Sequence, residues 1–199
     1  YSLTGTKFVL SNANHRYDFT IRADGGTDAQ EVFPETYTLH EDSQPKGYKT
    51  APDQTVTIAA GVPGQVLPVV DEPLFGTLNA LVKKVPAAGY ATTRPTAGAQ
   101  LTVNYYDNPE PEANPKQTWI IQTLADGNGN YTAKLDQAHL VSGSLTYGEN
   151  VLPLGCITIQ ETKAPEGYLL NNTVWKMQIL QSGNGVIYSS TTQPEIQNV

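Results

Sequence analysis

Two stretches that lie far apart in the chain carry nearly the same pattern. Residues 37–48 read YTLHEDSQPKGY and residues 157–168 read ITIQETKAPEGY. In each, β-branched or aromatic residues alternate along a strand that carries a glutamate, Glu41 or Glu161, and a Pro-x-Gly-Tyr turn ends the strand. A repeat of this kind indicates two copies of one structural module. We therefore expect two related domains of unequal size within the 199 residues.

The boundary between the two copies is expected near residues 71–76, which read DEPLFG. A β-like run ends there in an acidic break with proline and glycine, and a new strand begins directly afterwards. We expect one domain over residues 1–73 and a second over residues 74–199. A linker this short predicts modules that restrain one another.

The pattern of apolar residues predicts strands throughout. Helical periodicity is nearly absent, whereas short alternating runs bounded by Gly, Pro, Asn and Asp recur along the chain. The sequence therefore predicts an all-β chain with a β-sandwich in each half. The expected strands cover residues 7–11, 17–21, 36–41, 55–59, 66–70, 77–85, 99–105, 118–123, 131–135, 156–161, 175–180 and 185–189.

Charge and hydropathy exclude several function classes. The formal net charge is −7 and no cluster of Lys and Arg is present, which disfavours binding to nucleic acid or to an anionic membrane. No apolar run approaches the roughly 20 residues that a membrane-spanning helix needs. The chain opens at Tyr1 without a charged, apolar leader, so we expect a mature piece of a protein.

Few residues suggest metal binding, redox chemistry or enzymatic turnover. Cys156 is the only cysteine, so no intrachain disulfide can form, and its place on a strand predicts a small buried hydrophobic residue. The histidines His15, His40 and His139 stand apart, which argues against a zinc site. No nucleophile elbow, phosphate loop or metalloprotease motif is found. We expect no metal, no cofactor and no enzyme.

The second copy of the repeat resembles a known motif. Residues 152–155, LPLG, and residues 161–171, ETKAPEGYLLN, closely resemble the E-box of Gram-positive surface proteins with Cna B-type domains. This family, also called the SpaA-like prealbumin fold, builds pili and adhesin stalks, and often has one helical turn where residues 136–141 lie here. The resemblance is specific for the second half of the chain and weaker for the first. It implies two tandem prealbumin-like β-sandwich domains.

The resemblance also implies a covalent bond within the second domain. Domains of this family with an E-box usually join a Lys on the first strand to an Asn or Asp on the last strand, with the E-box Glu between them. By motif match, Glu161 is the acid, Lys84 the amine and Asn198 the acceptor. Lys83 is the alternative lysine. It is the neighbour of Lys84 on the same strand, and it would point to the opposite face unless a β-bulge intervenes.

The expected chemistry follows from burial. An apolar core disfavours both an ammonium and a carboxylate, so a buried Lys can become a neutral nucleophile and a buried Glu a protonated acid. Held against the Asn side chain, the amine attacks the carbonyl carbon while the Glu moves protons and ammonia leaves. The result is an isopeptide bond that forms once, without turnover.

The first domain departs from this pattern. Residues 3–10 resemble the second strand of the family and residues 67–73 its last, with Asp71 in the reactive position and Glu41 as the acid. The first strand, with its lysine, is missing. Three explanations remain: a truncated chain, a strand supplied by another chain or peptide, or a domain that never forms the bond. Lys7 is a further candidate, although its place in the motif argues against it.

These expectations lead to three functional hypotheses. The first is a structural stalk or pilus module on the surface of a Gram-positive bacterium, assembled with other pilin or adhesin domains. The second is an adhesin that recognises host matrix protein or glycan through the proline-rich loop at residues 108–115 or loops around Tyr147, with Tyr105 and Tyr106 nearby. The third is a scaffold whose incomplete first domain captures a lysine-bearing strand.

Overall fold

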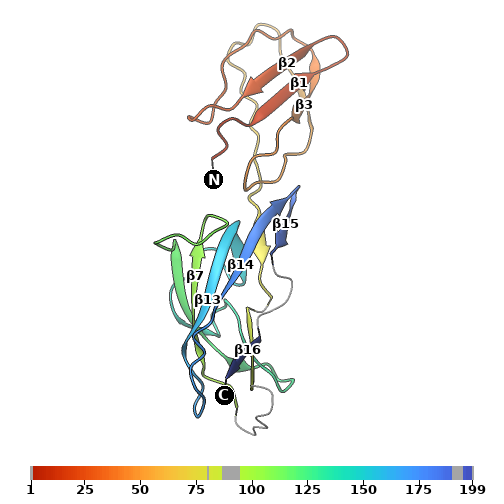
Figure 1. Cartoon of the computed structure of the whole chain (residues 1–199). Helices are drawn as coiled ribbons and strands as arrows, with labels where there is room; N and C mark the ends of the chain where they lie inside the picture. The colour runs from red at the N-terminus through yellow and green to blue at the C-terminus, as the bar shows by residue number, and fades with distance from the viewer. Residues whose placement is uncertain (1, 80, 87–94, 190–194, 199) are drawn as a thin grey trace. The chain divides into compact units, whose positions relative to one another are not determined.

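The computed structural model describes residues 2–79, 81–86, 95–189 and 195–198. Its strands form two compact units (Figure 1). Unit 1 comprises Tyr1–Leu74 together with Gln181–Gly185, and unit 2 comprises Phe75–Leu180 together with Val186–Val199. In the described part of the chain all regular structure is β-strand, so the all-β prediction is confirmed.

Unit 1 contains one four-stranded antiparallel sheet in the order β2-β1-β3-β4. The strands are β1 (Lys7–Ser11), β2 (Arg16–Thr20), β3 (Thr36–Glu41) and β4 (Gln54–Thr57). In β3 every second residue is buried, which is the pattern of a strand with one face on a core. Phe8, Leu10, Tyr37 and Leu39 form this core.

The expected strand at residues 66–70 is not formed, and this prediction is wrong. Exposure nevertheless alternates along the segment: Leu67 and Val69 pack against the core, whereas Val66 and Val70 are 82% and 85% exposed. Within the described residues no strand pairs with this segment. The segment thus has the alternation of a strand, but a strand also needs a partner to satisfy its backbone groups.

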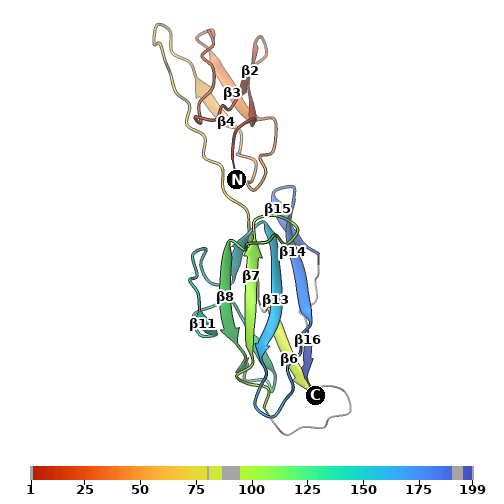
Figure 2. The same ribbon diagram turned by 60° about the vertical axis from the view of Figure 1, so that its left-hand side comes forward.

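Unit 2 is built around a six-stranded sheet in the order β11-β8-β7-β13-β14-β15. Figure 2 shows β7, β13 and β14 side by side, with β6 next to β16. A four-stranded sheet has the order β16-β6-β10-β9, and β12 pairs with β5. The bounds are β5 (Phe75–Thr77), β6 (Val82–Pro86), β7 (Gln100–Tyr106), β8 (Gln117–Gln122), β9 (Leu124–Ala125), β10 (Tyr131–Ala133), β11 (Leu140–Ser142), β12 (Val151–Pro153), β13 (Gly155–Lys163), β14 (Val174–Ser182), β15 (Gly185–Tyr188) and β16 (Glu195–Asn198).

Most predicted strands of unit 2 are confirmed with shifts of one or two residues at their ends. The expected strand at residues 77–85 is instead divided into β5 and β6. Leu78 and Leu81, between them, are buried with a spacing of three, which breaks the two-residue period of a strand. Residues 137–139 form a turn, with the backbone N–H of Leu140 bonded to the carbonyl of Asp136, and not an assigned helix.

Gly155 opens β13 in a conformation that only glycine suits. Its φ is 148°, and a Cβ added there would lie 2.0 Å from the backbone oxygen of Tyr106. Tyr106 is paired with the following residue, Cys156, in the β7–β13 ladder. The glycine of the LPLG sequence thus lets the two central strands of unit 2 approach each other closely.

Candidate functional site

Three polar side chains of unit 2 meet in its interior. Lys84 comes from β6, Glu161 from β13 and Asn198 from β16, and their exposed fractions are only 2%, 1% and 2%. Fully buried Lys, Glu and Asn side chains are rare unless they are paired with one another. Sequence reasoning singled out these three residues, and the structure brings them together.

Strand pairing determines which lysine points inward. β6 pairs in parallel with β16, with Lys84 level with Ile196, and antiparallel with β10, with Lys84 level with Tyr131. No register shift occurs between β6 and either neighbour. Alternation therefore directs Lys84 inward and Lys83 outward. Lys83 Nζ lies 3.2 Å from the exposed carboxylate of Glu195.

The carboxylate of Glu161 lies between the other two side chains. Its Oε1 is 2.6 Å from Lys84 Nζ, and its Oε2 accepts a hydrogen bond of 2.7 Å from Asn198 Nδ2. The Asn198 amide also donates to the backbone oxygen of Leu169. One acid thus contacts both an amine and a carboxamide, and can pass protons from the first to the second.

The turn after β13 holds Glu161 in place. The backbone N–H of Asn171 donates to Glu161 Oε2 at 2.8 Å, and the Asn171 side chain donates to the oxygen of Gln197 on β16 at 2.8 Å. Directly opposite Glu161 on β7 is Leu101, which is completely buried. The role of Asn171 was not predicted from the sequence. A signal for it is its sequence separation of ten residues from the glutamate, which recurs in the first copy of the repeat.

Burial changes the ionisation of the lysine. Desolvation lowers the pKa of the Lys84 ammonium, and the nearby Glu161 carboxylate opposes part of this effect. Within the described residues Lys84 Nζ, Glu161 Oε1 and Asn198 Oδ1 also lack a partner with hydrogen-bond geometry. A buried polar group without a partner destabilises a fold by about 1–3 kcal/mol. The triad thus combines a close pair of Lys84 and Glu161 with buried polar atoms whose hydrogen-bonding capacity is incompletely satisfied.

Unit 1 repeats part of this arrangement. Glu41 ends β3 and is 4% exposed, and its Oε2 accepts a hydrogen bond from the backbone N–H of Ala51. Ala51 follows Glu41 by ten residues, just as Asn171 follows Glu161. Glu41 lies directly opposite Phe8, as Glu161 lies opposite an apolar residue in unit 2. The E-box geometry is thus present in both units.

Asp71 is the second carboxyl group of unit 1. Burial raises the pKa of Asp71, and burial together with the charge of Asp71 raises the pKa of Glu41. Glu41 Oε1 and Asp71 Oδ1 are buried without hydrogen-bond partners among the described residues. A buried carboxyl group, Glu41, near the half-buried carboxyl group of Asp71 favours a shared proton or an added cation.

The lysines of unit 1 do not take the place that Lys84 has in unit 2. Lys7 is exposed on β1, where alternation turns it away from the face that Phe8 and Glu41 share. Lys46 is exposed, and Lys49 Nζ pairs with Glu72 at 2.8 Å. None of them affects the pKa of Glu41 or Asp71. The candidate role of Lys7 therefore has no support in the geometry.

The loops proposed for binding are partly built into the fold. In the loop at residues 108–115, Glu110 accepts hydrogen bonds from Lys176 and Gln178 on β14, although most of the loop is exposed. Tyr105 and Tyr106 are buried, and the ring of Tyr147 packs edge-on against Tyr105 at 5.8 Å. These three residues therefore do not form the exposed tyrosine cluster that would favour a binding role.

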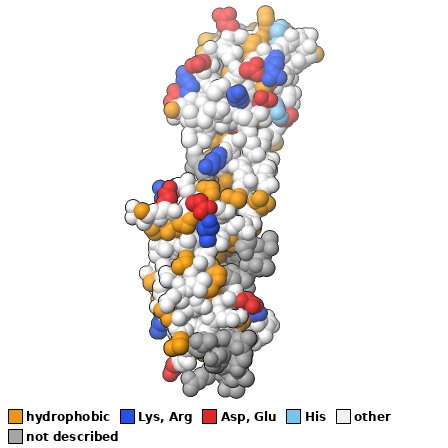
Figure 3. Space-filling view, viewed as in Figure 1, with side chains coloured by type: hydrophobic (Ala, Val, Ile, Leu, Met, Phe, Trp, Pro, Cys, Tyr) orange, Lys and Arg blue, Asp and Glu red, His pale blue; other side chains and the backbone are white. Residues whose placement is uncertain are grey.

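Other candidate groups give no further chemistry. Cys156 is fully buried, and burial raises the pKa of its thiol. In the described ranges no cluster of three or more His, Cys, Asp or Glu residues could hold a metal ion. On the face that Figure 3 shows, Lys and Arg side chains stand singly or beside Asp and Glu. Among the described residues no helix is long and apolar enough to cross a membrane.

One protein-family model matches both halves of the chain. The family model described as SpaA, a prealbumin-like fold domain, matches residues 1–69 and 83–193. Nearly the whole chain is therefore covered in two segments. The predicted fold class of two tandem prealbumin-like β-sandwich domains is confirmed. No curated protein matches the chain.

Three solved structures are similar to this chain over nearly its whole length. The Bacillus anthracis TIE protein has a TM-score of 0.63 and 21% identity, over 99% of this chain and 31% of that one. The chain thus spans about a third of that protein's length. A C-terminal fragment of the pilus adhesin SpaC from Lactobacillus rhamnosus GG gives a TM-score of 0.47 and 16% identity, over 99% of this chain and 90% of that one. GBS52, the minor pilin of Streptococcus agalactiae, gives a TM-score of 0.32 and 12% identity, over 99% of this chain and 83% of that one.

Proposed function

The chain belongs to the SpaA family of prealbumin-like fold domains, and on this premise we propose that it is a structural module of a Gram-positive cell-surface protein or pilus. Residues 1–73 and 74–199 are its two domains. It stands in series with other pilin or adhesin domains outside the cell and bears mechanical load. Its one covalent reaction is the joining of its own strands, so it is not an enzyme with turnover.

The observation that carries this proposal is the position of Glu161 between Lys84 and Asn198. The neutral amine of Lys84 attacks Cγ of Asn198, and Glu161 takes a proton from the nitrogen and gives one to the leaving amide nitrogen. An amide bond forms between Lys84 Nζ and Asn198 Cγ, the bond from Cγ to Nδ2 breaks, and one ammonia leaves. Lys83, which faces outward beside Glu195, is not the nucleophile.

Such a bond explains how a chain with a single cysteine is stabilised outside the cell. It joins β6 to β16, which are near the two ends of unit 2 in sequence, so a pull on the termini cannot separate these strands. The chain-entropy model for disulfides gives about 4–5 kcal/mol for closing a loop of roughly 100 residues. The bond also replaces the buried amine of Lys84 with a neutral amide.

The experiment is intact mass measurement of the denatured chain, followed by peptide mapping. We expect a deficit of one ammonia and one branched peptide that contains Lys84 and Asn198. Glu161→Ala should restore the encoded mass, whereas Glu195→Ala, which removes only the exposed partner of Lys83, should leave the deficit unchanged. The full encoded mass in the unaltered chain would contradict the proposal.

The alternative of a host-binding adhesin has weaker support. An exposed aromatic cluster would favour it, but Tyr105 and Tyr106 are buried in the core of unit 2. The loop at residues 108–115 is mostly exposed, and its Glu110 is bonded to Lys176 and Gln178 on β14. The structural role therefore remains the proposal for this chain.

A further inference from the structure

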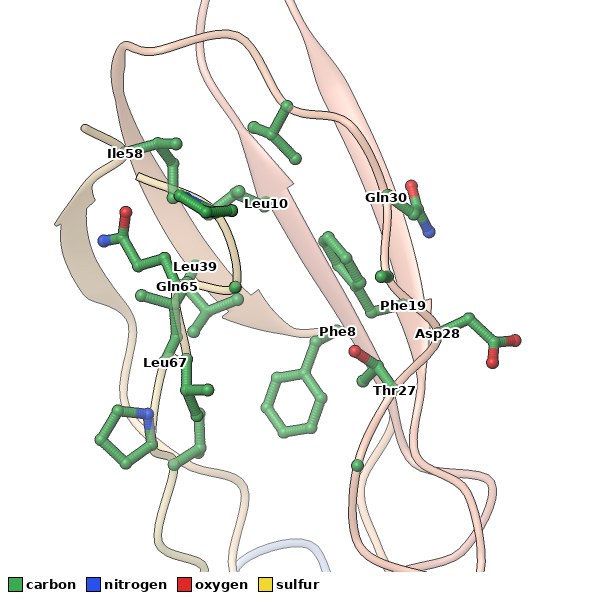
Figure 4. Close-up of a pocket in the computed structure, with 18 of the residues that line it drawn as sticks. Phe8, Leu10, Phe19, Thr27, Asp28, Gln30, Leu39, Ile58, Gln65 and Leu67 are labelled. Atoms are coloured by element: carbon green, nitrogen blue, oxygen red, sulfur yellow. The ribbon is translucent and has the colours of Figure 1, made fainter. Parts of the chain in front are cut away.

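The inward face of the unit 1 sheet extends beyond its cavity towards the turn between β1 and β2. Figure 4 shows Phe8, Leu10 and Phe19 on the part of this face that lines the cavity. Tyr17, which is level with Leu10 on the neighbouring strand, packs against the same core but lies outside the cavity lining. The end of the face at Tyr17 is therefore a separate surface of unit 1.

A row of rings crosses this end of the face from the core to solvent. The imidazole of His15 stacks on the ring of Phe33, with centroids 4.7 Å apart and planes at 29°. His15 also stacks with Tyr17 at 6.3 Å, and Tyr17 packs edge-on against Tyr37 at 5.9 Å. Tyr37 is buried, whereas Phe33 is 60% exposed. The row thus ends in an aromatic ring that contacts water.

The backbone of Phe33 is held on both sides. Its N–H donates to the hydroxyl of Tyr17 at 3.3 Å, and its carbonyl accepts a hydrogen bond of 2.9 Å from the hydroxyl of Tyr37. An exposed side chain on a fixed backbone loses less conformational freedom when a partner binds, so more of its contact energy appears as affinity. Phe33 is therefore a preorganised contact residue.

A carboxylate lies beside the same imidazole. Glu35 Oε2 is 3.4 Å from His15 Nδ1 and accepts a hydrogen bond of 2.7 Å from Asn12 Nδ2. Within the described residues no donor bonds to Glu35 Oε1, and the side chain is 38% exposed. Phe33 and Glu35 both contact His15, so one incoming side chain can reach the ring and the free carboxylate oxygen together.

Unit 1 is acidic, and the cation nearest to these residues in sequence points away from them. Residues 1–74 contain ten Asp and Glu against five Lys and Arg. Arg16 lies between His15 and Tyr17, but alternation places it on the other face of β2, where its guanidinium is 2.8 Å from Asp18. Complementary charge therefore favours a cationic partner at Glu35.

We propose that His15, Phe33 and Glu35 form an aromatic–carboxylate patch that docks an arginine side chain of a partner protein. The guanidinium stacks on the ring of Phe33 and donates to Glu35 Oε1. The patch gives the module a specific contact with a neighbouring protein, which goes beyond the load-bearing role proposed above. It lies wholly in unit 1 and does not depend on the bond between Lys84 and Asn198.

The chemistry of the patch selects arginine over other groups. An apolar side chain would cover the ring of Phe33 but remove water from Glu35 Oε1 without replacing its hydrogen bond, which is unfavourable. A lysine ammonium is more strongly hydrated and has no plane to stack. The guanidinium is planar and weakly hydrated, and it can stack on an aromatic ring while its N–H groups donate to a carboxylate.

The test is an NMR titration of the full chain with the capped peptide acetyl-Gly-Arg-Gly-amide. Physiological ionic strength screens general attraction to an acidic protein. We expect saturable chemical-shift changes centred on residues 12–17 and 31–37. The matched peptide with citrulline has nearly the same shape but no charge, and it should bind about fivefold more weakly. The peptide with lysine should also bind more weakly than the arginine peptide.

Variants of the patch make the result specific. Phe33→Leu keeps an apolar side chain but removes the ring, and should weaken binding about two- to fivefold. Phe75→Leu alters an exposed phenylalanine of unit 2 and should leave the affinity unchanged. Glu35→Gln should weaken binding about twofold or more. Glu31→Gln removes the same charge from an exposed position and should have little effect.

Several outcomes would overturn the proposal. One is the absence of saturable shifts up to the solubility limit of the arginine peptide, and another is equal binding of the citrulline peptide. A third is an equal loss in Glu31→Gln and Glu35→Gln, since the attraction would then be general to the acidic surface. Unchanged affinity in Phe33→Leu would also contradict it. In Glu35→Gln the side-chain oxygen can still accept the bond from Asn12, and unchanged amide shifts outside the patch verify that each variant is folded.

Discussion

Lys84 Nζ lies 2.6 Å from Glu161 Oε1, and both side chains are completely inaccessible to solvent. Removing two charges from water costs several kcal/mol per ion, and a buried pair regains this only with excellent geometry and further hydrogen bonds. Here desolvation lowers the pKa of the Lys84 ammonium, and the adjacent Glu161 carboxylate opposes only part of this effect. Burial therefore shifts the lysine towards its neutral form, which is the nucleophilic one.

Replacement of either lysine by arginine distinguishes the two candidates. Lys84→Arg should restore the encoded mass and destabilise unit 2 by at least about 4 kcal/mol, because the proposed bond and its loop closure are lost. Lys83→Arg should keep the ammonia deficit and change stability by less than about 1 kcal/mol, since exposed ion pairs contribute little. Intact mass and thermal unfolding measure both effects. Loss of the ammonia deficit and of stability in Lys83→Arg, but not in Lys84→Arg, would identify Lys83 as the nucleophile.

The lowered pKa of Lys84 predicts how an uncrosslinked variant depends on pH. In Asn198→Ala the lysine has no acceptor, and its pKa in the folded state lies below that in the unfolded state. The unfolded chain therefore binds more protons between these two pKa values, so stability should rise as the pH rises through this window and then level off. Denaturant unfolding between neutral pH and pH about 10.4, the ordinary lysine value, measures the slope.

A second variant isolates the lysine as the source of this slope. In Lys84→Met with Asn198→Ala, no amine remains in the core, and the increase in stability over the same pH window should disappear. A slope that persists without the lysine would assign the titration to another group.

The E-box glutamate and its partners could be predicted because a motif gives their positions along strands. The choice between Lys83 and Lys84 needed the register, since a single bulge in β6 would exchange their directions. The pairing of β6 with β10 and β16 is regular, and this fixes Lys84 inward. The support from Asn171 was missed, because a backbone N–H leaves no trace in the identity of a residue.

Strand predictions failed where pairing, rather than pattern, decides the structure. Residues 66–70 alternate between the core and solvent, but no strand pairs with them in the part of the chain that the structure describes. The strands β9, β11 and β12 have only two or three residues, which is too short for a period of two to be recognised. Their pairing is set by neighbouring strands that the local sequence does not describe.

Gly155→Ala should strongly destabilise unit 2. The substitution introduces a Cβ 2.0 Å from the oxygen of Tyr106 in a φ region that non-glycine residues rarely adopt, so we expect a loss of at least about 3 kcal/mol. Gly129→Ala is the matched control, because its φ is also positive, at 84°, but no atom lies within 4 Å of the added Cβ. It should lose only about 1–2 kcal/mol. Chemical denaturation compares the two, and equal losses would mean that the contact with Tyr106 is easily relieved.

Asp71→Asn should stabilise unit 1 at neutral pH. The pKa values of Asp71 and Glu41 are both raised by burial, so the folded state binds more protons than the unfolded state between the ordinary carboxyl values and the raised ones. Stability of the unaltered unit therefore falls as the pH rises through that window. The substitution removes one of the two acids, lowers the pKa of Glu41 towards its ordinary range, and reduces this fall in stability.

Unfolding measured from pH 4 to pH 8 should show the two proteins equal in stability at the acidic end and the variant more stable at the neutral end. Asp53→Asn, which alters an exposed carboxylate beside His40, is the control and should show no such divergence. Equal pH profiles for the unaltered chain and Asp71→Asn would mean that the carboxyl pair of unit 1 is already neutralised by another group.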